Sequence, residues 1–210
     1  MGVVIRTAGE DDRELVVRLL DEAFQDDPVS SWVFPGTEYR RRTHHRLMAA
    51  FADLLADGRV DLTEDGAACA LWLPVPAGEP AGDGPGAEQG SESGEGAEDG
   101  PARIRAAVDP ENERVELIAR SRTDPPSGRA HAYLWMIGVV PERQGEGLGT
   151  ALIGTVLDRC DREGLPAYLE ASSARGKALY ERLGFEFTGR ALDLPDGPRM
   201  WPMWREPRTP

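Results

Sequence analysis

The chain has 210 residues, of which 40% are hydrophobic and 7% aromatic, so it is long enough for one domain with a hydrophobic core. Its formal net charge is -13, whereas proteins that bind nucleic-acid phosphates need a basic surface, so we expect no nucleic-acid partner. No segment approaches the roughly 20 apolar residues that span a bilayer, and the first residues do not resemble a signal peptide, which predicts a cytoplasmic protein with no membrane partner.

Two helices are expected in the first third of the chain. A short strand over 3–7 precedes a helix over 11–24, in which apolar side chains recur at helical spacing. Asp26-Asp27-Pro28 ends this helix, and a second helix runs over 37–55. The next residues predict a β-hairpin formed by two strands, 59–63 and 67–73.

Residues 77–101 differ in composition from the rest of the chain. They hold seven acidic residues and no Lys or Arg, and the remainder is almost entirely Gly, Ala, Ser and Pro. Such a segment cannot bury enough apolar surface to offset its conformational entropy. We therefore expect one domain over 1–210, in which 77–101 is a disordered acidic loop.

Strands and helices alternate in the second half of the chain. The predicted order is a helical region over 103–120 in two pieces separated at Asp109-Pro110, a strand over 131–140, a helix over 147–163, a strand over 167–171, a helix over 174–183, and a closing hairpin of 185–194 with 199–204. This order predicts an α/β fold, with a central mixed sheet flanked by helices.

The Cys and His residues give no indication of a metal site. Cys69 and Cys160 lie far apart within apolar patterns and are expected to be buried free thiols. His44 and His45 are adjacent, so they do not share a helix face, and we expect both to be exposed. No group of Cys and His has zinc-ligand spacing, and no metal is predicted.

The turn between the strand over 131–140 and the helix over 147–163 predicts an anion site. Gly145, Gly147 and Gly149 allow a ligand to approach the backbone, and the first turn of a helix offers free N–H groups and a partial positive charge. A Walker A loop would require a Lys here, and a dinucleotide-binding fingerprint requires a different glycine spacing. A glycine-rich helix cap without a ligand remains the alternative on this evidence.

Two motifs resemble those of the GNAT acetyltransferases. Gln144-x-x-Gly147-x-Gly149 follows a strand as the coenzyme A loop does in that family, and residues 178–185 are similar to its second signature. The resemblance implies a GNAT fold with about seven strands, two of them splayed, and acetyl-CoA as co-substrate. The residues that it places around acetyl-CoA are Ile137, Val139, Val140, Arg143, Gln144, Gly145, Glu146, Gly147, Leu148, Gly149, Thr150 and Ser173, the first three through their backbones.

The same resemblance assigns catalytic and substrate-binding roles. Tyr180 is expected to protonate the departing CoA thiolate, and Glu170, at a strand end, to bind the amine or relay its proton. His131 is a second candidate base. Phe24 and Trp32, with Phe34 and Tyr39, lie where the family forms its acceptor wall, and aromatic rings there suit a planar or apolar amine.

The function predicted from these features is direct acetyl transfer from acetyl-CoA to a primary amine of a small molecule. A peptide or protein N-acetyltransferase is an alternative within the same chemistry, and a CoA-binding module without catalysis is an alternative outside it. We expect a monomer or homodimer.

Overall fold

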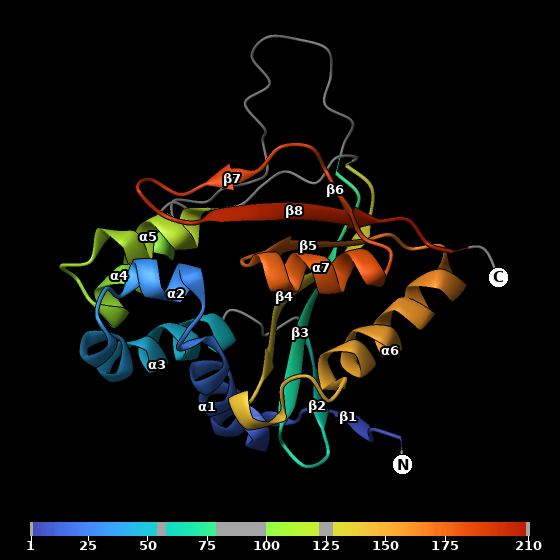
Figure 1. Ribbon diagram of the computed structural model, residues 1–210, viewed down its shortest axis with the longest axis horizontal. Helices are drawn as coiled ribbons and strands as arrows, with labels where there is room; N and C mark the ends of the chain where they lie inside the picture. Colours follow the sequence, from blue (N-terminus) through green and yellow to red (C-terminus); the bar gives the residue numbers. More distant parts are fainter. Residues whose placement is uncertain (1, 54–57, 79–99, 122–127, 209–210) are drawn as a thin grey trace, which may run out of the picture.

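The computed structural model describes residues 2–53, 58–78, 100–121 and 128–208 (Figure 1). The predicted acidic loop lies almost entirely outside these residues, as do the last two residues of the predicted helix over 37–55. The helices of the described parts include none that is long and apolar enough to cross a membrane.

The strands form one mixed sheet, as predicted. Within the described residues it has eight strands: β1 (Ile5–Thr7), β2 (Arg59–Thr63), β3 (Ala68–Val75), β4 (His131–Val139), β5 (Ala167–Ala171), β6 (Glu186–Phe187), β7 (Leu192–Asp193) and β8 (Arg199–Arg205). Their order is β1-β2-β3-β4-β5-β8-β6, and β7 pairs with β8. All neighbours are antiparallel except β4 and β5, which run parallel.

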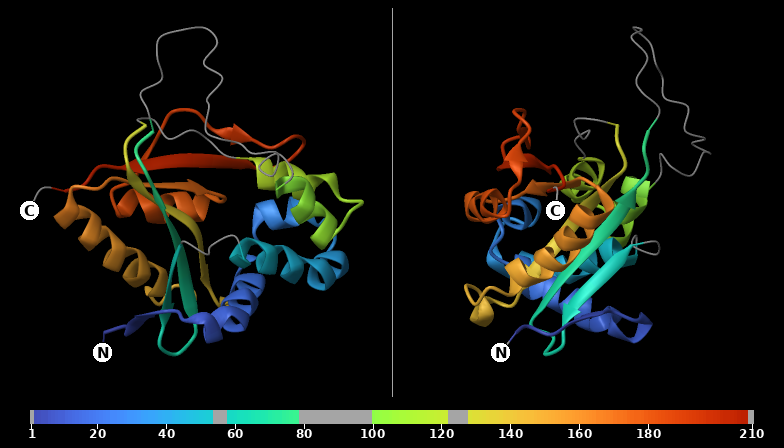
Figure 2. Two further views of the ribbon diagram at one scale, coloured as in Figure 1. Left: turned by 180° about the vertical axis from the view of Figure 1, so that it is seen from behind. Right: turned by 90° about the vertical axis from the view of Figure 1, so that its right-hand side faces the viewer.

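The helices cover the two faces of this sheet. They are α1 (Arg13–Phe24), α2 (Pro28–Val33), α3 (Thr37–Asp53), α4 (Gly100–Val108), α5 (Glu113–Arg120), α6 (Leu148–Glu163) and α7 (Ala174–Arg182). In Figure 1, α1 to α5 gather to the left of β3 and β4, and α6 lies to the right; Figure 2 shows the same arrangement from two further sides.

Alternation along β3 explains why there are two cores. Ala68 and Ala70 pack in a cluster with α6 and α7, whereas Cys69 and Leu71 pack in a cluster with α1 and α3. Successive side chains of a strand point to opposite faces, so each face of the sheet is buried by its own group of helices. Cys69 and Cys160 are both buried and free, as predicted, and desolvation raises the pKa of each thiol.

A β-bulge in β4 changes which face its side chains meet. Leu71 lies opposite Met136 and Trp72 lies opposite Leu134, so Trp135 is an extra residue on β4. Trp135 and Met136 consequently both contact the α1–α3 core, although they are adjacent in sequence. The bulge therefore brings two large side chains to the same side of the sheet.

The strands β4 and β5 separate where this bulge begins. They pair only from Ala132 with Ala167 to Leu134 with Leu169, and the rest of β4 continues without β5 beside it. This splayed pair was implied by the family resemblance, and it opens the sheet between its two helical layers.

Two expectations about the N-terminal helices need correction. Asp26-Asp27-Pro28 does end α1, but it also begins α2, which the sequence patterns did not indicate: the Asp27 carboxylate accepts the N–H groups of Val29 and Ser30, and Pro28 takes the first helical position. The prediction that His44 is exposed is wrong.

His44 is fully buried because α2 packs over α3. Its Nε2 lies 2.9 Å from Ser30 Oγ, and its Nδ1 lies 2.7 Å from Asp21 Oδ1. The imidazole thus joins α1, α2 and α3 through their polar groups, as buried polar atoms require. His45 is exposed, as predicted.

Candidate active site

A cavity of about 1120 Å³ opens where β4 and β5 separate. It is lined by the glycine-rich turn before α6 and by the start of α7, and it continues to residues of α1, α2, α3 and α5 on the other side of the sheet. The cavity therefore connects the predicted anion site with the predicted acceptor wall.

The glycine-rich turn has the backbone conformation that an anion site needs. Gly145 and Gly147 have φ values of 89° and 85°, in the left-handed region that favours glycine, and Gly147 begins α6 without a side-chain cap. The N–H of Ala151 makes the bond to the Gly147 carbonyl, so the N–H groups of Leu148, Gly149 and Thr150 have no partner within the helix. These N–H groups and the positive end of the α6 dipole are suited to phosphate oxygens.

The backbone of β4 beyond the bulge faces the gap. The Val140 N–H donates to the Ala67 carbonyl at 2.9 Å, and because bonding alternates along an antiparallel ladder, the polar groups of Ile137 and Val139 turn away from β3. The Val139 carbonyl accepts a hydrogen bond from the Gln144 amide at 3.3 Å. Val140 does not fit its predicted role, since its carbonyl also accepts the Arg143 N–H at 3.0 Å and both its backbone groups are in use.

Two arginines flank the turn. Arg143, which the sequence singled out, donates to Glu146 at 2.7 Å and to Asp65 at 3.0 Å. Arg175, which the sequence did not single out, reaches Gln144 Oε1 at 3.2 Å from the first turn of α7. Both line the cavity, so positive charge accompanies the free N–H groups.

Ser173, which the family resemblance placed near acetyl-CoA, lines the cavity and caps α7. Its hydroxyl accepts the N–H of Gly176 at 3.1 Å. Gly176 lies between this hydroxyl and Tyr180: a Cβ there would be 3.2 Å from Ser173 Oγ, a tight contact, and 3.5 Å from Tyr180 Cε2, an ordinary one.

Tyr180 itself lines the cavity and is 9% exposed. No residue in the described ranges accepts a hydrogen bond from its hydroxyl. Burial, and next the negative charge of Asp27, raise the pKa of the phenol, so its proton is retained at neutral pH. A protonated phenol is what the predicted role of Tyr180 requires.

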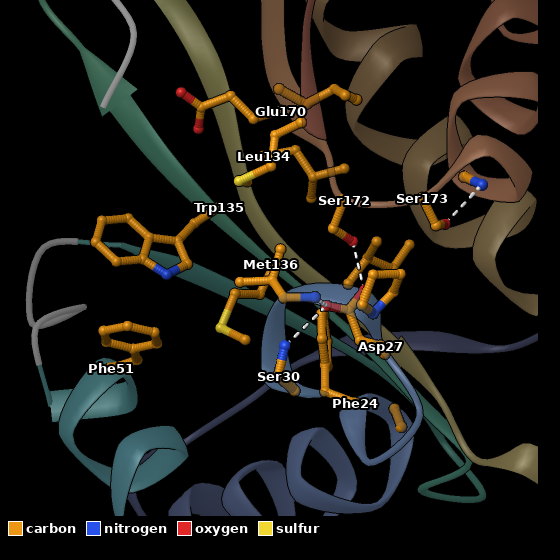
Figure 3. Close-up of a pocket in the computed structure, with 18 of the residues that line it drawn as sticks. Phe24, Asp27, Ser30, Phe51, Leu134, Trp135, Met136, Glu170, Ser172 and Ser173 are labelled. Carbon is orange, nitrogen blue, oxygen red and sulfur yellow. Dashed lines mark hydrogen bonds between the residues drawn. The ribbon is translucent and has the colours of Figure 1, made fainter. Parts of the chain in front are cut away.

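Asp27 is a cavity-lining carboxylate that the sequence indicated only as a helix breaker. Its Oδ2 accepts the hydroxyl of Ser172 at 2.6 Å, across 145 residues of sequence. Desolvation raises the pKa of Asp27. Figure 3 shows this carboxylate between Ser30 and Ser172, in the middle of the cavity. The local sequence signal, Asp before Pro, identifies a helix start but not a site.

Glu170 lies on the acceptor side of β5. Its carboxylate accepts the hydroxyls of Tyr133 at 2.6 Å and Tyr168 at 3.3 Å. Because Leu169 and Ala171 point into the α6 core, Glu170 points to the opposite face, where it lines the cavity.

The predicted substrate-binding residues divide between the cavity and the core. Phe24 lines the cavity, joined there by Phe51, Trp135 and Met136. Trp32 does not line it: the indole donates to the Pro195 carbonyl at 3.0 Å, and the Arg114 guanidinium lies over its ring. The Trp32 side chain is buried in the core.

His131 is also outside the cavity. It is 3% exposed and packs against Tyr168 and Trp204, and its Nδ1 lies 2.8 Å from the Arg129 carbonyl. The start of β4 lies before the point where β4 and β5 separate, so this ring cannot serve as the proposed base at the cavity. Within the described residues no cluster of His, Cys, Asp and Glu is placed to hold a metal ion.

Comparisons with known proteins relate part of the chain to a family. The profile of the Acetyltransferase (GNAT) family matches residues 96–185. An uncharacterized N-acetyltransferase of Schizosaccharomyces pombe is 42% identical over 55 residues, which are 26% of this chain and 22% of that protein. A mycothiol acetyltransferase of Brachybacterium faecium is 36% identical over 83 residues, 38% of this chain and 25% of that protein. The chain thus spans about a quarter of the length of these curated relatives.

The fold has a counterpart along the whole chain. A crystal structure from Corynebacterium glutamicum, described as histone acetyltransferase HPA2 and related acetyltransferase, superposes with a TM-score of 0.70 at 23% identity, covering 100% of this chain and 99% of that one. At this identity the likeness concerns the fold alone. The family profile, the curated relatives and the splayed sheet agree in relating residues 96–185 to the GNAT acetyltransferases, and the fold of the whole chain is similar to that of an acetyltransferase structure.

Proposed function

We propose that this chain transfers an acetyl group from acetyl-CoA directly to a primary amine of a small molecule. The observation that carries the proposal is the position of Tyr180: a buried, protonated phenol lines the same cavity as the open N–H groups at the start of α6. The GNAT family uses acetyl-CoA. The N–H groups are suited to bind its phosphates, and the phenol is suited to protonate the departing CoA thiolate.

The residues of the turn would hold the pyrophosphate. Backbone N–H groups over 145–150 supply the donors, and Arg143 and Arg175 supply the positive charge. The polar backbone groups of Ile137 and Val139 would bond the pantetheine arm in the gap beside β4. This placement directs the thioester toward Tyr180.

The chemical step follows from this placement. The amine nitrogen attacks the thioester carbonyl carbon and forms the C–N bond, while an N–H of β4 stabilises the oxyanion. The C–S bond then breaks, and the Tyr180 hydroxyl donates its proton to the departing thiolate. The amine proton passes through water to Glu170, which lines the cavity on the acceptor side.

The acceptor side supports a small molecule. Helices α1, α2, α3 and α5 all contribute to the cavity there, and Phe24, Phe51 and Trp135 give it aromatic walls. Such walls suit a compact apolar body rather than a solvated peptide backbone. Residues 131–204 also resemble puromycin N-acetyltransferase, but the resemblance is absent over 77–128, so the identity of the acceptor does not carry over and puromycin serves only as one compound to test.

A thiol-release assay with acetyl-CoA tests the proposal. The panel contains 2-phenylethylamine, puromycin, spermidine and a short peptide with a free N-terminus. We expect amine-dependent thiol release, and a stoichiometric acetylated product by mass spectrometry, with at least one small amine. Release with the peptide alone would favour the peptide acetyltransferase. CoA binding by calorimetry with no release across the panel would favour the non-catalytic module.

A further inference from the structure

Asp27 has a half-buried carboxylate that the chemical step proposed above does not use. Its carboxylate accepts hydrogen bonds from the N–H groups of Val29 and Ser30 and from the Ser172 hydroxyl, at 2.8, 3.3 and 2.6 Å. All three donors are neutral, and no Arg or Lys within the described ranges forms an ion pair with Asp27. The charge of His44 also acts on Asp27 and lowers its pKa, but the His44 imidazole pairs with Asp21. The Asp27 carboxylate is therefore hydrogen-bonded without an ion pair of its own.

Two other carboxylates, one buried and one partly buried, are instead paired with an arginine. Asp61 is fully buried and pairs with Arg59 at 2.8 Å. Asp161 receives two guanidinium hydrogen bonds from Arg205, at 2.7 and 2.8 Å, which lower the pKa of that carboxyl. Desolvation instead raises the pKa of Asp27. A charge taken out of water needs a partner of opposite sign, so the surroundings of Asp27 favour a cation that enters from the cavity.

Asp27 lies close to the residues proposed to carry out the reaction. The bond to Ser172 connects the α1–α2 junction with the segment that leads from β5 into α7, and the charge of Asp27 acts on the phenol of Tyr180. An ammonium group seated on Asp27 would therefore lie beside the group proposed to protonate the thiolate.

The cavity beyond Asp27 is apolar and aromatic. In Figure 3, Phe24 and Met136 lie near Asp27, and Trp135 and Phe51 lie together on the far side of the cavity. The rings of Trp135 and Phe51 meet edge to face, with centroids 5.9 Å apart. A ligand that places one positive charge on Asp27 would place its body against these side chains.

We infer that Asp27 binds the ammonium group of the acceptor, and that the acceptor is a primary amine with one positive charge and an aromatic or apolar body. This inference rests on the proposed function, because it concerns the acceptor side of the same cavity. It predicts that a neutral analogue of the same shape binds less well than the amine.

The test compares the binding of 2-phenylethylamine and 2-phenylethanol to the full chain saturated with CoA, by isothermal calorimetry. We expect the wild-type protein to prefer the amine by about 10- to 100-fold, as expected for one charged hydrogen bond. Asp27→Asn should abolish this preference. The asparagine removes the charge and keeps the helix cap, since Asn and Asp cap comparably. Glu22→Gln, an exposed change on α1, is the matched control and should retain the preference.

A second measurement does not depend on the variant being folded. The amide resonances of Val29 and Ser30, which donate to Asp27, should shift in the wild-type protein on addition of the amine and not of the alcohol. No preference for the amine in the wild-type protein, a preference retained by Asp27→Asn, or unmoved amide resonances would each overturn the inference. Thiol release measured in parallel separates the two proposals: amine preference without release contradicts the transferase, and release with a preference retained by Asp27→Asn contradicts Asp27.

Discussion

The two halves of the cavity are lined by different kinds of chemical group, backbone on one side and side chains on the other. On the half where we propose that acetyl-CoA binds, the cofactor half, the groups available to a ligand are the backbone N–H groups of the turn before α6, in which Gly145 and Gly147 have left-handed conformations, and the backbone edge of β4. On the acceptor half, they are side chains contributed by several helices and by the bulge at Trp135. A backbone site depends on the conformation of one short segment, whereas a side-chain site depends on how separate helices pack.

This difference has a consequence for specificity. Every residue except proline has a backbone N–H donor, so many sequences that preserve the turn and its glycines can form the cofactor half. The acceptor half changes whenever one wall residue changes, which permits one fold to serve many acceptors. The predictions that follow act on one half and leave the other as a reference.

The largest effect is expected where the two halves meet, at Tyr180. Tyr180→Phe removes the hydroxyl and keeps the ring, so it should lower kcat by about 10² to 10⁴-fold, the usual contribution of a positioned acid. The dissociation constant of acetyl-CoA should stay within about twofold, because the turn before α6 is unchanged. Steady-state kinetics and calorimetry measure the two quantities, and an unaltered kcat would remove Tyr180 from the mechanism.

The next effect concerns the framework of the acceptor half. His44→Leu removes the hydrogen bonds with Ser30 and Asp21 and leaves the buried Ser30 hydroxyl without a partner, whereas Asp21 keeps the Gln25 amide. The free energy of unfolding in urea titrations should fall by about 1–3 kcal/mol. His45→Leu, on the exposed neighbour, should change it by less than about 0.5 kcal/mol. Equal effects of the two changes would contradict a structural role for the buried imidazole.

A similar comparison applies to the cofactor half. Gly147→Ala places a side chain in a left-handed conformation, with φ at 85°, and the strain of about 1–2 kcal/mol should weaken acetyl-CoA binding by roughly tenfold. Gly154→Ala, within α6 and with open space around it, should instead stabilise the protein by up to about 1 kcal/mol without changing the affinity. Calorimetric titration of both variants decides whether the conformation at 147 matters to the ligand.

The smallest effect is a pH-dependent one at Asp27. Burial raises the pKa of Asp27 in the folded protein above its unfolded value of 3.8, so its contribution to stability is complete below that value and is lost as the pH rises through the folded pKa. Asp27→Asn does not titrate. The variant should therefore gain stability relative to the wild type between pH 3.5 and pH 7, as measured by urea unfolding. If the wild type instead gains stability relative to the variant as the pH rises over this range, the charge of Asp27 is compensated in the folded protein.

The order of elements and most of their boundaries could be predicted from the sequence. The helices over 103–120 and 174–183 and the strand over 167–171 follow from local periodicity and from punctuation such as Asp109-Pro110 and Gly184. These signals act within one turn or one strand, which is why they can be recognised without a tertiary structure. The buried cysteines followed from the same apolar patterns.

What the sequence by itself determined is the cofactor half: glycines that permit φ near 85° to 89°, a helix start behind them, and a tyrosine one helix later. The tertiary structure decided the acceptor half. Burial of His44 required α2 to pack on α3, the role of Asp27 required contact with Ser172 across 145 residues, and Trp135 reached the cavity through a bulge. The physical reason is that a backbone site is encoded by neighbours along the chain, whereas a side-chain site exists only after distant faces have packed together.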